Sequence, residues 1–303
     1  MVIVLGQRQS AARRQAPSSP PCVQYCGMST TANGEVSLYY ETFGADDDPV
    51  LLLVNGLGSQ CINFKAEFCE NFADRGFRVV RFDNRDVGLS SHLKGGPHYT
   101  VDDMAEDGFA VLDAAGADVA HIAGWSMGGM IVQAMALRHP GRILSMTSVM
   151  SAPGPIAGER DPAVTAAFGA PAATTRDEAA ERQLAGLRVW GSPACYDVDR
   201  ITADAHAAYD RSWDPEGRAR QSRAVGASPS RTAALGSLRV PSLVVHGDAD
   251  RLVPLENGRA TAAAIPGSRL EIVEGMGHDY PPQYWDQLVA LITTHARAAA
   301  PAS

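Results

Sequence analysis

The stretch Gly124-Trp125-Ser126-Met127-Gly128 decides the fold, because it joins two segments of different character. Val119 to Ala123 is a short apolar run typical of a β-strand, and Gly129 to Arg138 repeats apolar residues at helical spacing. A serine between two glycines on a sharp strand-to-helix turn is the pattern of a nucleophile elbow, which exposes the serine beside the positive end of the helix. The bare pattern arises by chance in many chains, so the surrounding strand and helix carry the prediction.

An acid and a histidine follow two later strand-like segments. Ser242 to His246 runs into the loop Gly247 to Pro254, and Leu270 to Val273 runs into Gly275-Met276-Gly277-His278. Parallel strands end at a common edge of the sheet, where such folds place their sites. A serine needs a base to accept its proton and an acid to orient that base. The order serine, acid, histidine along the chain is the order of this architecture.

We therefore predict Ser126 as the nucleophile and His278 as the base. Two acids compete for the orienting role. Asp250 is favoured over Asp248, because Asp248 lies early in the loop and suits a turn. His246, at the end of its strand, is expected to lie in the core near Asp250 rather than to take part in catalysis.

These segments together resemble the α/β-hydrolase superfamily, in particular the actinobacterial esterases and lipases similar to aclacinomycin methylesterase. The resemblance runs from about Glu35 to His295. It is strongest in four segments: Asp83 to Ser90, Gly124 to Gly128, Gly247 to Pro254 and Gly275 to His278. It implies that the acid of a Gly-x-x-Asp motif is Asp250, in agreement with the choice above. Many relatives have His-Gly after the third strand, whereas this chain has Asn55-Gly56.

An acyl-transfer site also needs two N–H donors for the oxyanion of the tetrahedral intermediate. The residue after the nucleophile supplies one, here the backbone N–H of Met127. The loop after the strand Val50 to Val54 supplies the other, and its position together with the resemblance indicates Leu57. The alternative for Leu57 is a plain hydrophobic loop residue.

The segment Gly56 to Cys61 also resembles the glycine fingerprint of a dinucleotide-binding unit, since it follows a strand and a second strand, Phe77 to Phe82, precedes an acid. Cys61 stands where that fingerprint needs a glycine or alanine for close packing. The sequence therefore argues against an NAD-dependent oxidoreductase. We interpret Asp83 to Asp86 as a charged turn in which Gly88 is free to adopt a positive φ.

Strand-like and helical segments alternate along most of the chain, for example at Val101 to Ala115 with Thr100 as the N-cap. The pattern predicts an α/β protein with a mostly parallel sheet and helices on both faces. With the resemblance, this becomes an α/β-hydrolase fold of eight strands. Its core is predicted at residues 28–153 and 239–299.

The alternation breaks over residues 154–238, which are rich in Ala and Arg and read as helical from Glu178 to Arg223. We predict a helical lid there, over the carboxyl edge of the sheet. Its aromatic residues, with Trp190 and Trp213 among them, and its lack of a dense basic patch favour an apolar acyl pocket. Residues 1–27 are polar and proline-rich, and we expect a disordered extension or a translation start placed upstream of Met28.

Composition excludes several classes of protein. The formal net charge of −8 argues against nucleic acid as a partner, and no apolar run reaches the roughly twenty residues of a membrane span. The chain shows no secretory signal, so the cytoplasm is the expected location. No metal-binding spacing occurs, and we expect neither a metal nor a cofactor. The cysteines are interpreted as reduced structural thiols: Cys22 and Cys26 in the extension, Cys61 and Cys69 on one helix, and Cys195.

The sequence thus predicts a serine hydrolase that cleaves a small-molecule carboxylic ester through an acyl-enzyme intermediate. Serine at position 126 argues against dehalogenase and epoxide-hydrolase chemistry, which use an aspartate there. Thioesterase, C–C hydrolase, peptidase and perhydrolase activities would use the same three side chains and stay open. A non-catalytic homologue that binds a ligand in the same pocket is the alternative from a different class.

Overall fold

The computed structural model describes residues 25–299, apart from 97, 159 and 160. Within this part of the chain eight strands form a single sheet in the order β1-β2-β4-β3-β5-β6-β7-β8. The strands are β1 Tyr25–Asn33, β2 Val36–Phe43, β3 Val50–Val54, β4 Arg78–Phe82, β5 Ala120–Trp125, β6 Ile143–Val149, β7 Ser242–Gly247 and β8 Arg269–Val273. From β3 to β8 all neighbours are parallel, and only β1–β2 and β2–β4 are antiparallel pairs. The predicted mostly parallel sheet is confirmed.

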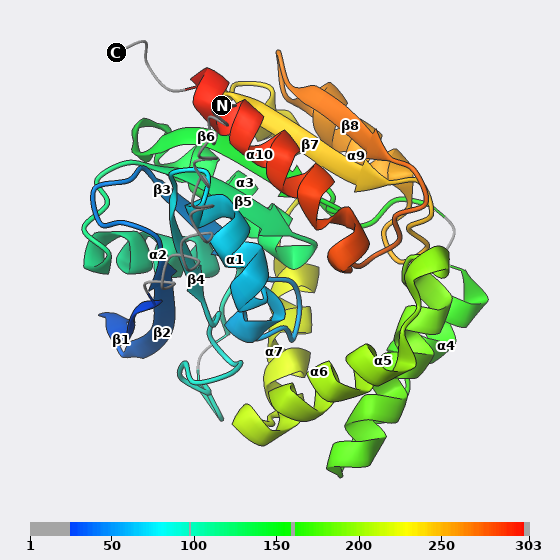
Figure 1. The fold of residues 1–303 in the computed structure, drawn as a ribbon. Coiled ribbons are helices and arrows are strands. Elements are labelled where there is room, and N and C mark those ends of the chain that lie inside the picture. The colour runs from blue at the N-terminus through cyan, green and yellow to red at the C-terminus, as the bar shows by residue number, and fades with distance from the viewer. Residues whose placement is uncertain (1–24, 97, 159–160, 300–303) are drawn as a thin grey trace, which may run out of the picture.

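Helices cover both faces of this sheet (Figure 1), because parallel neighbours require crossover connections. The helices around the sheet are α1 Ala66–Ala73, α2 Val101–Ala114, α3 Met127–Arg138, α9 Leu255–Ala264 and α10 Trp285–Ala299. Each face of the sheet has its own hydrophobic core, and alternate residues of β3 contribute to each. Leu52 and Val54 pack with α2 and α3, whereas Leu51 and Leu53 pack with α1 and α10. Thr100 caps α2 through a complete capping box, as its position predicted.

A cap, defined here as residues 154–238, separates β6 from β7. It contains α4 Pro162–Phe168, α5 Arg176–Trp190, α6 Val198–Arg211, α7 Pro215–Ala227 and α8 Thr232–Leu235. Figure 1 shows α4 to α7 gathered beside the sheet rather than on either of its faces. Hydrogen bonds from the cap reach the loops that follow β3, β4 and β8, which places the cap at the carboxyl edge.

Two local predictions were wrong. Strand β1 begins at Tyr25, inside the predicted extension, while residues 1–24 lie outside the described part of the chain. The segment escaped prediction because β1 is an edge strand paired with β2, and its exposed Met28 and polar residues give no apolar alternation. Cys61 and Cys69 do not share a helix, since Cys61 lies in a 3₁₀ turn, Cys61–Asn63, that ends before α1.

Three cysteines, Cys61, Cys69 and Cys195, are buried free thiols, whereas Cys22 lies outside the described residues. Burial raises the pKa of the Cys69 thiol to about 12, which keeps it protonated and unreactive. No helix in the described ranges is long and apolar enough to cross a membrane.

Candidate active site

Ser126 lies at the junction of β5 and α3 in a strained backbone conformation, with φ 57° and ψ −119°. The flanking glycines are required by space. A Cβ on Gly124 would overlap the carbonyl oxygen of Gly128, and a Cβ on Gly128 would overlap that of Val54. The Ser126 N–H donates to the Val149 carbonyl oxygen at 2.9 Å, which holds the turn against β6. The G-x-S-x-G pattern is thus a steric requirement of this turn.

A continuous chain of hydrogen bonds joins three of the predicted site residues. Ser126 Oγ lies 2.9 Å from His278 Nε2, and His278 Nδ1 lies 2.7 Å from Asp250 Oδ2. The other carboxylate oxygen, Oδ1 of Asp250, accepts from the backbone N–H groups of Leu252 at 2.9 Å and Val253 at 2.8 Å. A carboxylate only accepts hydrogen bonds, so Nδ1 of His278 carries the proton and Nε2 is free to accept one from the serine.

The two neighbouring groups that competed for roles lie elsewhere. Asp248 Oδ1 accepts from the Gly275 N–H at 2.7 Å and so joins the β7 loop to the β8 loop, which is the turn role expected for it. His246 is fully buried, and its Nε2–H donates to the Val253 carbonyl oxygen at 2.7 Å. Burial lowers the pKa of His246, so the imidazole stays neutral beside Asp250.

Ser126 and His278 open on a cavity of about 670 Å³, which is large enough for a small organic molecule. Leu57 and Met127 line the same cavity. Their backbone N–H groups donate to no acceptor within the described residues. A Cβ on Gly56 would lie 3.2 Å from the Ser126 Cβ, so the loop after β3 runs directly against the serine. Two free N–H donors therefore border the serine, one from the loop after β3 and one from the first residue of α3.

The cap holds the histidine loop in place, a function that sequence reasoning missed. The His278 N–H donates to the Trp190 carbonyl oxygen at 2.6 Å, and the Gly277 N–H donates to Ser192 Oγ at 2.9 Å. Asp279 accepts from the Ser192 N–H at 2.8 Å, and burial raises the pKa of its carboxyl. No signal in the sequence points to these contacts, since they join residues more than eighty positions apart.

Gln221 of α7 holds the loop that carries Leu57. Its side chain is fully buried, and both ends of its amide are used. Oε1 accepts from the Gly58 N–H at 2.8 Å, and Nε2 donates to the Arg85 carbonyl oxygen at 2.7 Å. The cap thus contacts both the loop that carries Leu57 and the loop that carries His278.

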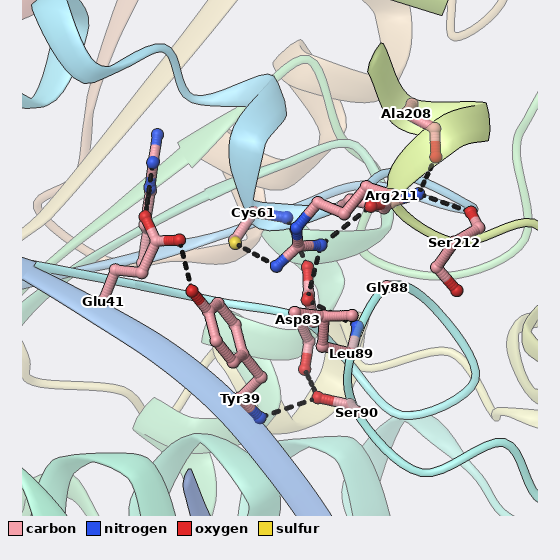
Figure 2. Close-up of polar contacts among 12 residues, drawn as sticks. Tyr39, Glu41, Cys61, Asp83, Gly88, Leu89, Ser90, Ala208, Arg211 and Ser212 are labelled. Carbon is pink, nitrogen blue, oxygen red and sulfur yellow. Dashed lines mark hydrogen bonds and ion pairs between the residues drawn. The ribbon is translucent and has the colours of Figure 1, made fainter. Parts of the chain in front are cut away.

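A buried ion pair joins the cap to the loop that follows β4 (Figure 2). Arg211, at the end of α6, points into the core and forms a 2.8 Å ion pair with Asp83. Asp83 is completely buried and also accepts from the backbone N–H groups of Cys61 and Leu89. Gly88 has a φ of +60° beside this carboxylate, which confirms the predicted charged turn. The same turn also binds the cap through the ion pair between Asp83 and Arg211, and the sequence did not indicate this contact.

One cluster has the composition of a metal site. Donor atoms of Asp86, His92 and Asp214 lie within 4.8 Å of one another. Arg220 already supplies a positive charge there, because its Nη2 lies 2.8 Å from both Asp86 and Asp214. The Tyr99 hydroxyl donates to the remaining oxygen of Asp86. The cluster is a structural ion network that joins α7 to the loop after β4.

The aromatic residues of the cap divide between two places. Trp190 lines the cavity that holds Ser126. Trp213 lies instead on a smaller cavity of about 100 Å³, and its indole N–H donates to the Ala173 carbonyl oxygen. The expectation of an apolar pocket is also wrong in part, because charged side chains line the larger cavity: Asp161, Arg200, Asp204, Arg218, Arg251 and Asp279.

Known proteins resemble this chain over most of its length. The family model of the alpha/beta hydrolase fold matches residues 49–280. Rhodomycin D methylesterase DauP of Streptomyces sp. (strain C5) is 31% identical, over 88% of this chain and 96% of the relative. The bifunctional esterase/perhydrolase DCH of Acinetobacter calcoaceticus is 28% identical, over 84% and 94%.

Among solved structures, a hydrolase from Pseudomonas aeruginosa PA01 superposes with a TM-score of 0.70 and 26% identity, over 91% of this chain and 99% of that one. The matched residues 49–280 include the serine turn, the cap and the histidine loop. Sheet order, elbow and sequence similarity therefore agree, and the chain belongs to the α/β-hydrolase fold family.

Proposed function

We propose that this protein is a serine hydrolase that cleaves a small-molecule carboxylic ester through an acyl-enzyme intermediate. The observation that carries the proposal is the hydrogen-bonded chain from Ser126 through His278 to Asp250, which opens on a cavity of about 670 Å³. The relatives named as a methylesterase and an esterase support an ester as the substrate. Residues 154–238 act as the cap over a core of residues 28–153 and 239–299.

In the first half of the reaction, Ser126 Oγ attacks the acyl carbon while its proton passes to His278 Nε2. The carbonyl oxygen becomes an oxyanion and accepts hydrogen bonds from the backbone N–H groups of Leu57 and Met127. The ester C–O bond then breaks, and His278 gives the proton to the departing alkoxide, which leaves as an alcohol. Asp250 keeps its charge throughout and stabilises the imidazolium.

In the second half, a water molecule replaces the alcohol. His278 takes a proton from the water as it attacks the acyl-enzyme, and a second oxyanion forms in the same place. Collapse of this intermediate returns the proton to Ser126 Oγ and releases the carboxylic acid. One ester and one water thus give one alcohol and one acid, with no change of oxidation state.

Labelling with a fluorophosphonate probe tests the nucleophile directly. We expect the pure protein to be labelled at one residue, and expect Ser126→Ala to abolish labelling. A panel of p-nitrophenyl esters from acetate to octanoate then measures ester hydrolysis, with the Ser126→Ala protein as the background control. A protein that binds these esters but is neither labelled nor active would be a ligand-binding homologue, and the proposal would be wrong.

A further inference from the structure

Arg218 of α7 lines the smaller cavity and also the cavity that holds Ser126, and no carboxylate in the described residues pairs with its guanidinium group. Three arginines line this cavity. Arg251 is paired with Asp161, and Arg200 lies 3.6 Å from Asp204, which Lys65 also contacts. Arg218 forms no ion pair with any residue that the structure describes, and it is half-buried. The cavity wall therefore carries one guanidinium group that no carboxylate of the described residues pairs with.

The surroundings of Arg218 make a purely structural role unfavourable. Its guanidinium carbon lies over the Phe168 ring, 4.5 Å from the ring centre, in a cation–π contact. The nearby Arg182 donates to the carbonyl oxygens of Ala170 and Pro171 rather than to a carboxylate, so it adds a like charge. Burial and Arg182 lower the pKa of Arg218. Withdrawing a cation from water beside another cation costs free energy that an anionic ligand would offset.

The position of Arg218 relates it to the reacting ester. A Cβ on Gly58 would lie 2.9 Å from the Arg218 Cδ, and a Cβ on Gly56 would lie 3.2 Å from the Ser126 Cβ. Two residues of chain span at most about 7 Å, so the stem of Arg218 lies within about 16 Å of the serine. A substrate with several methylene groups between its two functional ends would reach both.

We propose that Arg218 forms an anion subsite, and that the preferred substrate is an ester whose acyl part ends in a carboxylate. This inference rests on the proposed ester hydrolysis. A planar guanidinium matches a carboxylate through two parallel N–H donors, and no described residue accepts a hydrogen bond from the Arg218 side chain. The ester lies at Ser126 while the remote carboxylate binds Arg218 on the cap side of the cavity.

The test compares esters of equal length that differ in charge. The p-nitrophenyl monoesters of succinate, glutarate, adipate, pimelate and suberate are each paired with the neutral p-nitrophenyl ester of a monoacid of matching length. We expect kcat/KM to favour the acidic ester at an optimal length. Arg218→Gln should lower this acidic-to-neutral ratio by about 10- to 100-fold at that length, as the loss of a charge-assisted hydrogen bond predicts.

Control variants distinguish the loss of the Arg218 charge from a loss of the folded cap. Arg223→Gln removes an exposed cation from the same helix and should leave the ratio unchanged. Arg218→Lys keeps the charge without the bidentate geometry and should retain part of the preference. Melting temperatures of all variants report whether the cap stays folded. The proposal fails if the wild-type protein prefers no acidic ester, or if Arg218→Gln lowers kcat/KM equally for the acidic and the neutral ester of each pair.

A binding measurement keeps this inference distinct from the proposed function. Isothermal titration calorimetry of the Ser126→Ala protein with free glutarate, adipate and suberate requires no turnover. We expect binding that Arg218→Gln weakens by at least tenfold. Binding of equal strength in both proteins, or none in either, would overturn the subsite even if ester hydrolysis is established. Conversely, an inactive protein that binds these diacids through Arg218 would overturn only the catalytic proposal.

Discussion

Replacing Asp250 with Asn removes one oxygen acceptor from a carboxylate whose two oxygens have different partners. Oδ1 accepts from two backbone N–H groups, of Leu252 and Val253, and Oδ2 faces His278 Nδ1 at 2.7 Å. Asparagine has a single oxygen. The two backbone donors orient that oxygen toward themselves, so the new NH₂ group faces the histidine.

The reversed donor then selects the wrong tautomer of His278. An NH₂ group requires an unprotonated Nδ1, and the neutral imidazole consequently carries its proton on Nε2, which faces Ser126 Oγ. That nitrogen cannot accept the serine proton. We expect kcat to fall by up to about 10⁴, or about 5 kcal/mol in the barrier. KM should change little, because Asp250 is buried and does not line the cavity.

Steady-state hydrolysis of p-nitrophenyl butyrate measures kcat and KM, and thermal melting reports the fold. Asp248→Asn is the matched control, because Asp248 accepts the Gly275 N–H and lies outside the hydrogen-bonded chain. We expect this variant to stay within a few-fold of wild type. Retention of kcat within tenfold in Asp250→Asn, or an equal loss in Asp248→Asn, would refute the reasoning.

Three further predictions concern the Ser126–His278 pair, the support of the Leu57 loop by Gln221, and the buried His121 of β5. Ser126→Ala and His278→Ala should each lower kcat by on the order of 10⁶, and the double variant should be little worse, because the two groups act as a unit; additive losses would contradict this. Gln221→Leu frees the Gly58 N–H, so kcat and the affinity for a boronic acid analogue of the tetrahedral intermediate should fall by about tenfold with little change in KM. Equal effects on substrate and analogue would make Gln221 merely structural. Burial lowers the pKa of His121 from 6.5 to about 4, so protonation favours the unfolded chain. Stability should be full above pH 6.5 and should fall by up to about 3 kcal/mol as the pH drops to 4, whereas His121→Gln should flatten this dependence in denaturant titrations.

The sequence alone determined the features that depend on short-range sterics and on chain order. Gly124 and Gly128 are needed because a Cβ at either position would overlap a neighbouring carbonyl oxygen. The G-x-S-x-G pattern shows this requirement within five residues. Asp250 and His278 follow consecutive parallel strands, so their approach to Ser126 follows from the edge at which those strands end. The capping residues of α2 are local in the same sense.

Only the tertiary structure decided how the cap supports the site. Gln221 lies 163 positions from Gly58, and the Trp190 carbonyl oxygen that holds the His278 loop belongs to a backbone with no sequence signature. The charge balance of Arg218 is also a tertiary property, because it depends on which carboxylates the fold brings near each of three arginines. The sequence shows which side chains are polar or charged. It does not show which of them become partners, because packing brings together segments that lie far apart in the chain. Ion pairing and burial depend on distance in space rather than on separation in sequence.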